Sequence, residues 1–138
     1  MTRVTRQIKF SASHRLFNPK WSDEKNNQVF GLCANELGHG HNYTLEVSVE
    51  GSVDKESGYI VDLKLLKELI NELIVNPCDH KHLNYQVPFL KNVIPTVENL
   101  AEVFFHRLAP EVAKISTGCL HSVKIYETDN NWAEYSHD

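Results

Sequence analysis

The chain has few cysteines, no excess of basic residues and no long apolar run, and each absence excludes a class of protein. Its three cysteines cannot all pair within one chain, so free thiols and a reducing cytoplasm are expected. The first ten residues, MTRVTRQIKF, lack the apolar run of a signal peptide. No stretch approaches the roughly 18 apolar residues of a membrane span. We therefore expect a cytoplasmic protein that contacts no membrane.

The charge balance argues against a nucleic-acid partner. The formal net charge is −4 at pH 7, whereas nucleic-acid modules usually carry a basic stripe. Hydrophobic residues make up 41% of the chain and charged residues 23%, which excludes disorder. A length of 138 residues fits one domain, 1–138, with an ordinary core. Eight histidines are many for this length, and their positions matter more than their number.

Apolar and polar residues alternate in segments 4–16 and 39–50, as in half-buried strands. Shorter strands are predicted over 121–128 and 132–135, and residues 17–38 form a long polar connection. Apolar spacing of three and four predicts two helices. The first, 63–75, is capped by Asp62 and stopped by Asn76-Pro77; the second, 97–109, is capped by Thr96, carries Glu98 in its first turn and ends near Pro110. The order ββααββ predicts an α+β domain with an antiparallel sheet and both helices on one face.

Three histidines share the apolar faces of the first two strands: His14 on the first, His39 and His41 on the second. A single histidine there is usually a core residue with one hydrogen bond. Three unpaired buried imidazoles would each cost about 1–3 kcal/mol, which favours a shared metal ion. Zn²⁺ bound by three imidazoles with an open fourth position is typical of catalytic sites.

Cys33 lies in the polar connection, with five residues between it and His39. A thiolate ligand would close the zinc site, so we do not take Cys33 as the fourth ligand. It could instead act as a base or nucleophile near the metal. A structural Cys-His-His-His zinc site and a small buried thiol remain alternatives.

Asp79-His80 follows the first helix, and a carboxylate beside an imidazole can orient it for proton transfer. A solvated polar turn is the alternative. Glu127 lies on the apolar side of the strand predicted over 121–128. A buried carboxylate there needs a hydrogen-bonding partner. The donor edge of a guanidine-like heterocycle could be that partner. A solvent-facing edge position is equally compatible with the sequence.

The chain resembles the 6-pyruvoyltetrahydropterin synthase family over nearly its whole length. The resemblance is carried by FSASHRL at 10–16, FGLCANELGHGHNY at 30–43, GYIVDLKLLK at 58–67, CDHKHLN at 78–84, PTVENLA at 95–101 and YETDNN at 126–131. It implies a T-fold, with a four-stranded antiparallel sheet and two helices on one side. It also implies a homohexamer, a dimer of trimers, with active sites at subunit interfaces.

By similarity, His14, His39 and His41 bind Zn²⁺, Cys33 abstracts protons, and Asp79 with His80 forms its partner pair. Glu127 anchors the pterin ring, and Thr96 and Glu98 belong to a motif that lines the pterin pocket. The implied substrate is 7,8-dihydroneopterin triphosphate, and the implied enzyme is a lyase that eliminates triphosphate. No nicotinamide or flavin is needed, and the sequence carries no dinucleotide fingerprint.

Relatives in queuosine biosynthesis convert the same substrate into 6-carboxytetrahydropterin and release acetaldehyde. Their cysteine commonly lies closer to the His-Gly-His triplet, with three intervening residues. The five intervening residues here, 34–38, resemble the pyruvoyl-forming type without settling the product. A non-catalytic pterin- or metal-binding T-fold protein is a further alternative, against which the combination of Cys33, Asp79 and His80 argues.

Overall fold

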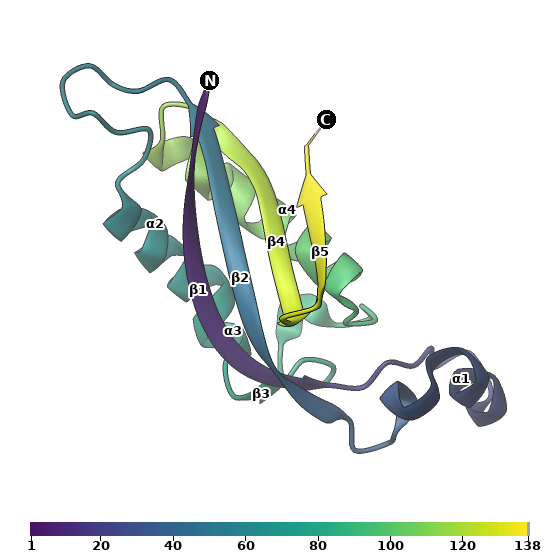
Figure 1. Cartoon of the computed structure of the whole chain (residues 1–138). Helices are drawn as coiled ribbons and strands as arrows, with labels where there is room; N and C mark the ends of the chain where they lie inside the picture. The colour runs from purple at the N-terminus through teal and green to yellow at the C-terminus, as the bar shows by residue number, and fades with distance from the viewer. Residues whose placement is uncertain (138) are drawn as a thin grey trace.

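The computed structural model describes residues 1–137 and has the predicted α+β class (Figure 1). Its strands are β1 (Thr2–His14), β2 (His39–Gly51), β3 (Lys81–His82), β4 (Cys119–Thr128) and β5 (Asn131–Ser136). Its helices are α1 (Asp23–Phe30), the 3₁₀ turns η1 (Gly31–Ala34) and η3 (Pro88–Leu90), α2 (Leu63–Ile70), the π-helical turn η2 (Asn71–Val75), α3 (Asn76–Cys78) and α4 (Val97–Ile115).

The sheet has five strands in the order β3-β1-β2-β4-β5, not the predicted four. The four long strands pair antiparallel, as predicted, whereas β3 runs parallel to β1 beside Ala12 and Ser13. Backbone bonds fix β3 there: His80 N–H donates to the Ser11 carbonyl at 2.6 Å, and Leu83 N–H to that of Ser13 at 2.8 Å. A two-residue strand is too short to show alternation, which is why the sequence did not predict it.

One face of the sheet is covered by α2 and α4, which lie together behind the strands in Figure 1. Every second side chain of β2 faces these helices. Four of them are fully buried: Tyr43, Leu45, Val47 and Val49. The helices contribute Leu66, Ile70 and Phe104, which are equally inaccessible. Burial of this apolar surface holds the sheet and helices together, because about 25 cal/mol is gained per Å² removed from water.

Both predicted helices extend past the prolines that were expected to end them. The first continues through a π-helical turn and ends at Cys78, so Pro77 lies within its last turn, at the start of α3. The second continues beyond Pro110 to Ile115. Past Pro110, Val112 is fully buried in the core, and this packing outweighs the hydrogen bond that a proline cannot donate.

The predicted polar connection contains a helix of its own. The Ser22 hydroxyl caps α1 by accepting the N–H of Lys25 at 3.1 Å, and Asp23 and Glu24 follow in the first turn, where the helix dipole favours acids. In Figure 1, α1 stands apart from the sheet, at the end where β1 finishes and β2 begins. This is also the end of the sheet opposite the two termini.

All three cysteines are free thiols. Cys78 is fully buried, and burial raises the pKa of its thiol to about 12. Within residues 1–137, no helix is both long and apolar enough to cross a bilayer.

Candidate metal centre and active site

The three predicted histidines converge at one end of the sheet. His14 ends β1, His39 begins β2, and the two residues are direct cross-strand partners. His41 follows two residues later and therefore projects from the same face. The ligand-capable nitrogens of His14, His39 and His41, the histidine cluster, all lie within 4.8 Å of one another.

The cluster geometry suits a metal ion. The Nε2 atoms of His14 and His39 are 3.1 Å apart, and the three ring centroids are separated by 4.6–4.9 Å. Two nitrogens bound to one zinc at about 2.0–2.1 Å must lie within about 4 Å of each other. His41 Nε2 is buried without a hydrogen bond in the described chain; Glu127 Oε1, 3.4 Å away, is within ion-pair range only. A metal would satisfy this orphaned nitrogen.

The surroundings of His14 keep its ring uncharged and oriented. It is fully buried, and its Nδ1 lies 2.8 Å from the Pro95 carbonyl and 3.2 Å from the Tyr43 hydroxyl. Nδ1–H donates to the carbonyl, which leaves the Nε2 lone pair free to bind a metal. Burial lowers the pKa of His14 to about 4, with the hydrogen bond to Pro95 opposing and the neighbouring His39 and His41 assisting. Burial also lowers the pKa of His41.

Cys33 lies on the 3₁₀ turn η1 and is partly buried. Its carbonyl accepts the N–H of Leu16 at 2.8 Å, and the Ala34 carbonyl accepts Arg15 Nε–H at 2.8 Å. Both bonds tie the turn to the segment just after His14. Among the described residues, the group that could hold a metal consists of the three histidines and does not include Cys33. The thiol is thus held near the end of β1 but outside the histidine cluster.

Asp79 and His80 form a real pair and not merely a polar turn. Asp79 Oδ2 lies 3.0 Å from His80 Nδ1, and Asp79 Oδ1 accepts the backbone N–H of Ser11 at 2.9 Å. The bond from Ser11 is the main cause that lowers the pKa of Asp79. The His80 backbone has a left-handed φ of 60°, and its side chain is 81% exposed. A cavity of about 400 Å³ is bordered by His80 and by His41 of the cluster.

Glu127 faces the histidine cluster and not open solvent. Its side chain is 22% exposed, and its register with β5 shifts between Tyr126 and Thr128, which is a bulge around Glu127. Bulges commonly re-aim side chains beside functional sites. Among residues 1–137, His41 alone lies within ion-pair distance of the carboxylate, which leaves it able to accept a ligand's donors.

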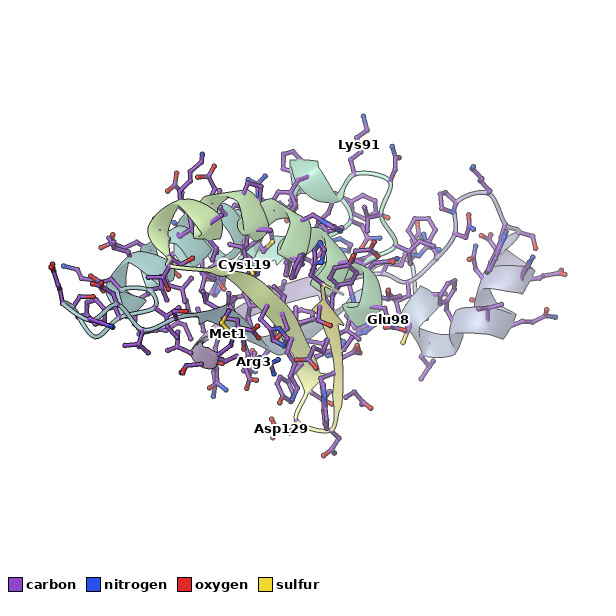
Figure 2. All side chains as sticks on the ribbon, turned by 90° about the horizontal axis from the view of Figure 1, so that it is seen from above. Met1, Arg3, Lys91, Glu98, Cys119 and Asp129 are labelled. Carbon is purple, nitrogen blue, oxygen red and sulfur yellow. The ribbon has the colours of Figure 1, made fainter. Side chains whose placement is uncertain are left out.

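Neither Thr96 nor Glu98 is among the described residues that line the cavity beside the cluster. The Thr96 hydroxyl caps α4 by accepting the N–H of Asn99 at 3.2 Å, as predicted. Glu98, labelled at the first turn of α4 in Figure 2, borders a separate cavity of about 460 Å³ with Asn130 and Trp132. Thr96 directly follows Pro95, whose carbonyl orients His14.

Sequence reasoning missed three residues beside the cluster. Tyr43 and Pro95 orient His14, and neither carries a local signal of that role beyond the apolar parity of Tyr43. His82 has a buried Nε2 without a partner among residues 1–137 and a position that lowers the pKa of His14. A Cβ on Gly38 would lie 2.6 Å from the His14 carbonyl oxygen and 3.0 Å from His82 Nε2, so a glycine, here with φ of 76°, lets the backbone before His39 pass close to both.

Comparison with known proteins gives a consistent result across nearly the whole chain. The family described as 6-pyruvoyl tetrahydropterin synthase matches residues 3–138. The 6-pyruvoyl tetrahydrobiopterin synthase of Homo sapiens is 44% identical over 133 residues, which are 96% of this chain and 90% of the relative. The solved 6-pyruvoyl tetrahydropterin synthase of Caenorhabditis elegans superposes with a TM-score of 0.88 at 36% identity and covers 99% of this chain and 96% of its own.

A relative with the other product name is also similar. A putative 6-carboxy-5,6,7,8-tetrahydropterin synthase of Archaeoglobus fulgidus is 35% identical over 96 residues, which are 70% of this chain and 73% of the relative. The match is shorter and the identity lower than for the human protein. Similarity thus favours the pyruvoyl-forming relatives.

Proposed function

The chain belongs to the 6-pyruvoyl tetrahydropterin synthase family, and on this basis we propose that it is a zinc-dependent lyase. It eliminates triphosphate from 7,8-dihydroneopterin triphosphate and rearranges the product internally to 6-pyruvoyltetrahydropterin. The observation that carries the proposal is the convergence of three imidazoles beside Glu127 in a chain 44% identical to a synthase of that name.

The histidine cluster fits Zn²⁺ by donor type, by spacing and by the orphaned Nε2 of His41. Bound there, the ion supplies a Lewis acid for the side-chain oxygens of the substrate. The protein's own contribution is to hold neutral, oriented imidazoles. Pro95 fixes the tautomer of His14, and burial keeps its ring uncharged.

Glu127 orients the substrate. Its carboxylate can accept two hydrogen bonds in parallel from the 2-amino group and N3–H of a pterin ring, as guanidinium groups donate to carboxylates. Glu127 Oε1 lies 3.4 Å from His41 Nε2, so this carboxylate is beside the cluster. Thr96 and Glu98 contribute to the pterin pocket in this proposal.

Cys33 is the base that removes the substrate's side-chain proton, and its position outside the cluster leaves the metal's open position to substrate. Asp79 holds Nδ1 of His80, which leaves Nε2 to exchange protons with the reacting centre and with water. The side chain is oxidised as the ring is reduced, so no external redox cofactor takes part.

The active enzyme is a homohexamer, a dimer of trimers, with sites completed between subunits. Two observations support this assembly. β3 covers β1 only at Ala12 and Ser13, and β5 is paired on one side only, so long strand edges remain for neighbouring chains. The His80 ring is largely exposed in the single chain, where a partner can meet it. The three free thiols support a reducing compartment, the cytoplasm.

Product identification tests the proposal most directly. Purified zinc-loaded protein is incubated with 7,8-dihydroneopterin triphosphate, and mass spectrometry follows triphosphate, the pterin product and acetaldehyde. We expect triphosphate and 6-pyruvoyltetrahydropterin. 6-Carboxytetrahydropterin with acetaldehyde would instead support the queuosine-type reaction, which the Archaeoglobus fulgidus similarity keeps as the second candidate. Pterin binding without product would identify a non-catalytic protein.

Cys33→Ala tests the base. We expect turnover to fall by about 10²–10⁴-fold, as for loss of a general base, while zinc content stays at one ion per chain. Cobalt-substituted protein provides the control on ligation, since a Cys33 thiolate ligand would give an intense charge-transfer band that disappears in the variant. Normal turnover by Cys33→Ala would exclude Cys33 as the base.

A further inference from the structure

A cavity of about 720 Å³ lies between the segment that follows β1 and the loop that precedes α4. Lys20 and Lys91 border it, and none of the acidic residues that the structure describes does, although the whole chain carries a net charge of −4. Small-molecule sites typically measure about 300–1,000 Å³. We infer that this space, the basic cavity, binds a phosphorylated ring compound.

The two ammonium groups are available to an anion. The ion pairs of residues 1–137 involve neither Lys20 nor Lys91, and neither Nζ donates a hydrogen bond to a described residue. Figure 2 shows the Lys91 side chain extending outward from its loop, and Lys91 is among the residues that line the cavity. Two unpaired cations facing one opening favour a ligand group with two or more negative charges, such as a phosphate ester.

An aromatic face in the cavity suits a planar ring. Tyr85 is 63% exposed, although one side of its ring packs on His82 with centroids 4.6 Å apart and planes inclined by 31°. Tyr85 lines the cavity together with both lysines. Phe17 lines it too, and the Arg15 guanidinium lies 3.9 Å from the centroid of its ring and holds that ring in place. A planar ring can stack on an exposed aromatic side chain of this kind.

The walls of the basic cavity are preformed. Asn84 bonds both the N–H and the carbonyl of Arg15, each at 2.8 Å, and so joins the two sides. The Asn26 amide bonds Asn18 in the same reciprocal way, at 2.8 and 3.0 Å. Asn92, with a left-handed φ of 65°, sets the loop that carries Lys91. A site that needs little reorganisation loses little binding energy to ordering.

The basic cavity shares two backbone segments with the histidine cluster. Ile94 lines the cavity, and the next residue, Pro95, orients His14; Phe17 lies three residues after His14 on the other side. Two sources of phosphate therefore fit. One is the phosphorylated tail of the substrate, which rests on the proposed function, and the other is a separate phosphorylated ligand that binds beside the metal centre.

Binding is tested without turnover, on the zinc-loaded protein, by calorimetry with phenyl phosphate. This probe carries one phosphate on a planar ring and chelates metal ions far more weakly than a polyphosphate does. We expect binding that weakens with added salt and that falls at least about tenfold in Lys20→Gln/Lys91→Gln, which loses two charge-assisted hydrogen bonds. The matched control Lys64→Gln/Lys67→Gln changes the net charge equally on α2 and should keep the wild-type affinity.

Tyr85→Ala distinguishes the contribution of the ligand's ring to binding from that of its phosphate. It should weaken phenyl phosphate about threefold to tenfold and leave inorganic phosphate unchanged, because only the ring contact is lost. No binding to the wild type, equal affinity in Lys20→Gln/Lys91→Gln, or equal losses in both lysine pairs would overturn the inference.

Steady-state kinetics then distinguish the two sources. If the cavity holds the substrate's tail, phenyl phosphate inhibits competitively, and Lys20→Gln/Lys91→Gln raises KM with kcat little changed. If a separate ligand binds, inhibition is non-competitive and KM is unchanged. Either pattern supports the site. Because binding is measured directly, the inference can fail while triphosphate release persists, and it can hold in a protein that releases none.

Discussion

The histidine cluster and the Asp79–His80 pair both lie against the last four residues of β1, yet their surroundings are opposite. His14 is fully buried, and strand geometry places all three imidazoles of the cluster. The His80 side chain is 81% exposed and lies on a turn with left-handed backbone. Asp79 accepts the backbone N–H of Ser11 with one carboxylate oxygen and contacts the His80 ring with the other. Burial lowers the pKa of His14 and of His41, which suits metal binding, whereas exposure lets the pair exchange protons.

Of the changes considered, removal of the His14 side chain should have the largest effect, because it takes a buried imidazole out of the histidine cluster. In His14→Ala, we expect zinc affinity to fall by more than about a hundredfold, since loss of a supporting partner alone costs 10–100-fold. Turnover should disappear with the metal. Chelator competition and metal analysis measure the loss. His121→Ala, which removes a half-buried histidine near Glu50 at the other end of the sheet, is the control and should retain one zinc per chain. Full zinc content in His14→Ala would refute the ligand assignment.

Asp79→Asn should impair the exposed Asp79–His80 pair without changing zinc binding at the histidine cluster. The amide oxygen can still accept the Ser11 N–H, but it no longer holds a charged His80 ring. We expect kcat to fall by about 10²–10⁴-fold while zinc affinity and unfolding stay near wild type. Asp129→Asn, on the exposed turn between β4 and β5 (Figure 2), is the matched control. A loss of zinc in Asp79→Asn would mean that the two regions are not independent.

The depressed pKa of His14 predicts a pH dependence for the metal-free protein. The folded pKa is about 4 against 6.5 for the free side chain, so between these values the unfolded chain binds more protons. Stability should therefore fall as the pH drops from about 6.5 to about 4, by up to about 3 kcal/mol. Urea unfolding of chelator-treated protein across this range measures the slope. His14→Gln cannot titrate there and should show a shallower slope; an unchanged slope would assign the effect to other groups.

Tyr43→Phe should give the smallest effect. The variant keeps the ring but removes the hydroxyl 3.2 Å from His14 Nδ1, and the Pro95 carbonyl remains to orient the imidazole. We expect zinc affinity to fall by about tenfold at most and the free energy of unfolding to change by about 1 kcal/mol. Chelator competition and urea unfolding check both values. Loss of the metal would show that the hydroxyl, and not the carbonyl, fixes the tautomer.

The long strands and the shared face of the three histidines could be predicted because their signals are local. Alternation placed His14, His39 and His41 on one apolar parity, and β1 and β2 confirm it. Helix ends were wrong because the sequence shows the prolines but not the packing of Val112, which continues α4 beyond Pro110. The helix α1 and the two-residue β3 were missed, since neither has a periodic apolar pattern long enough to detect.

The roles of the individual site residues follow from the family resemblance, and the structure adds contacts that the sequence could not. Asp79 meets His80, and Glu127 faces His41; both contacts were open questions from the sequence. Thr96 was correctly predicted as a helix cap. Its role and that of Glu98 in pterin binding stay predictions, as do the catalytic assignments of Cys33 and the pair.

By itself, the sequence determined which residue types face the core and which strand parity carries the histidines, because side-chain direction along a strand depends only on neighbouring residues. Tertiary structure alone decided that His14 stands opposite His39, that the Pro95 carbonyl selects its metal-binding nitrogen, and that Asp79 reaches Ser11. These contacts join residues 25, 81 and 68 positions apart. They depend on register and on packing across the whole sheet, which no local pattern encodes.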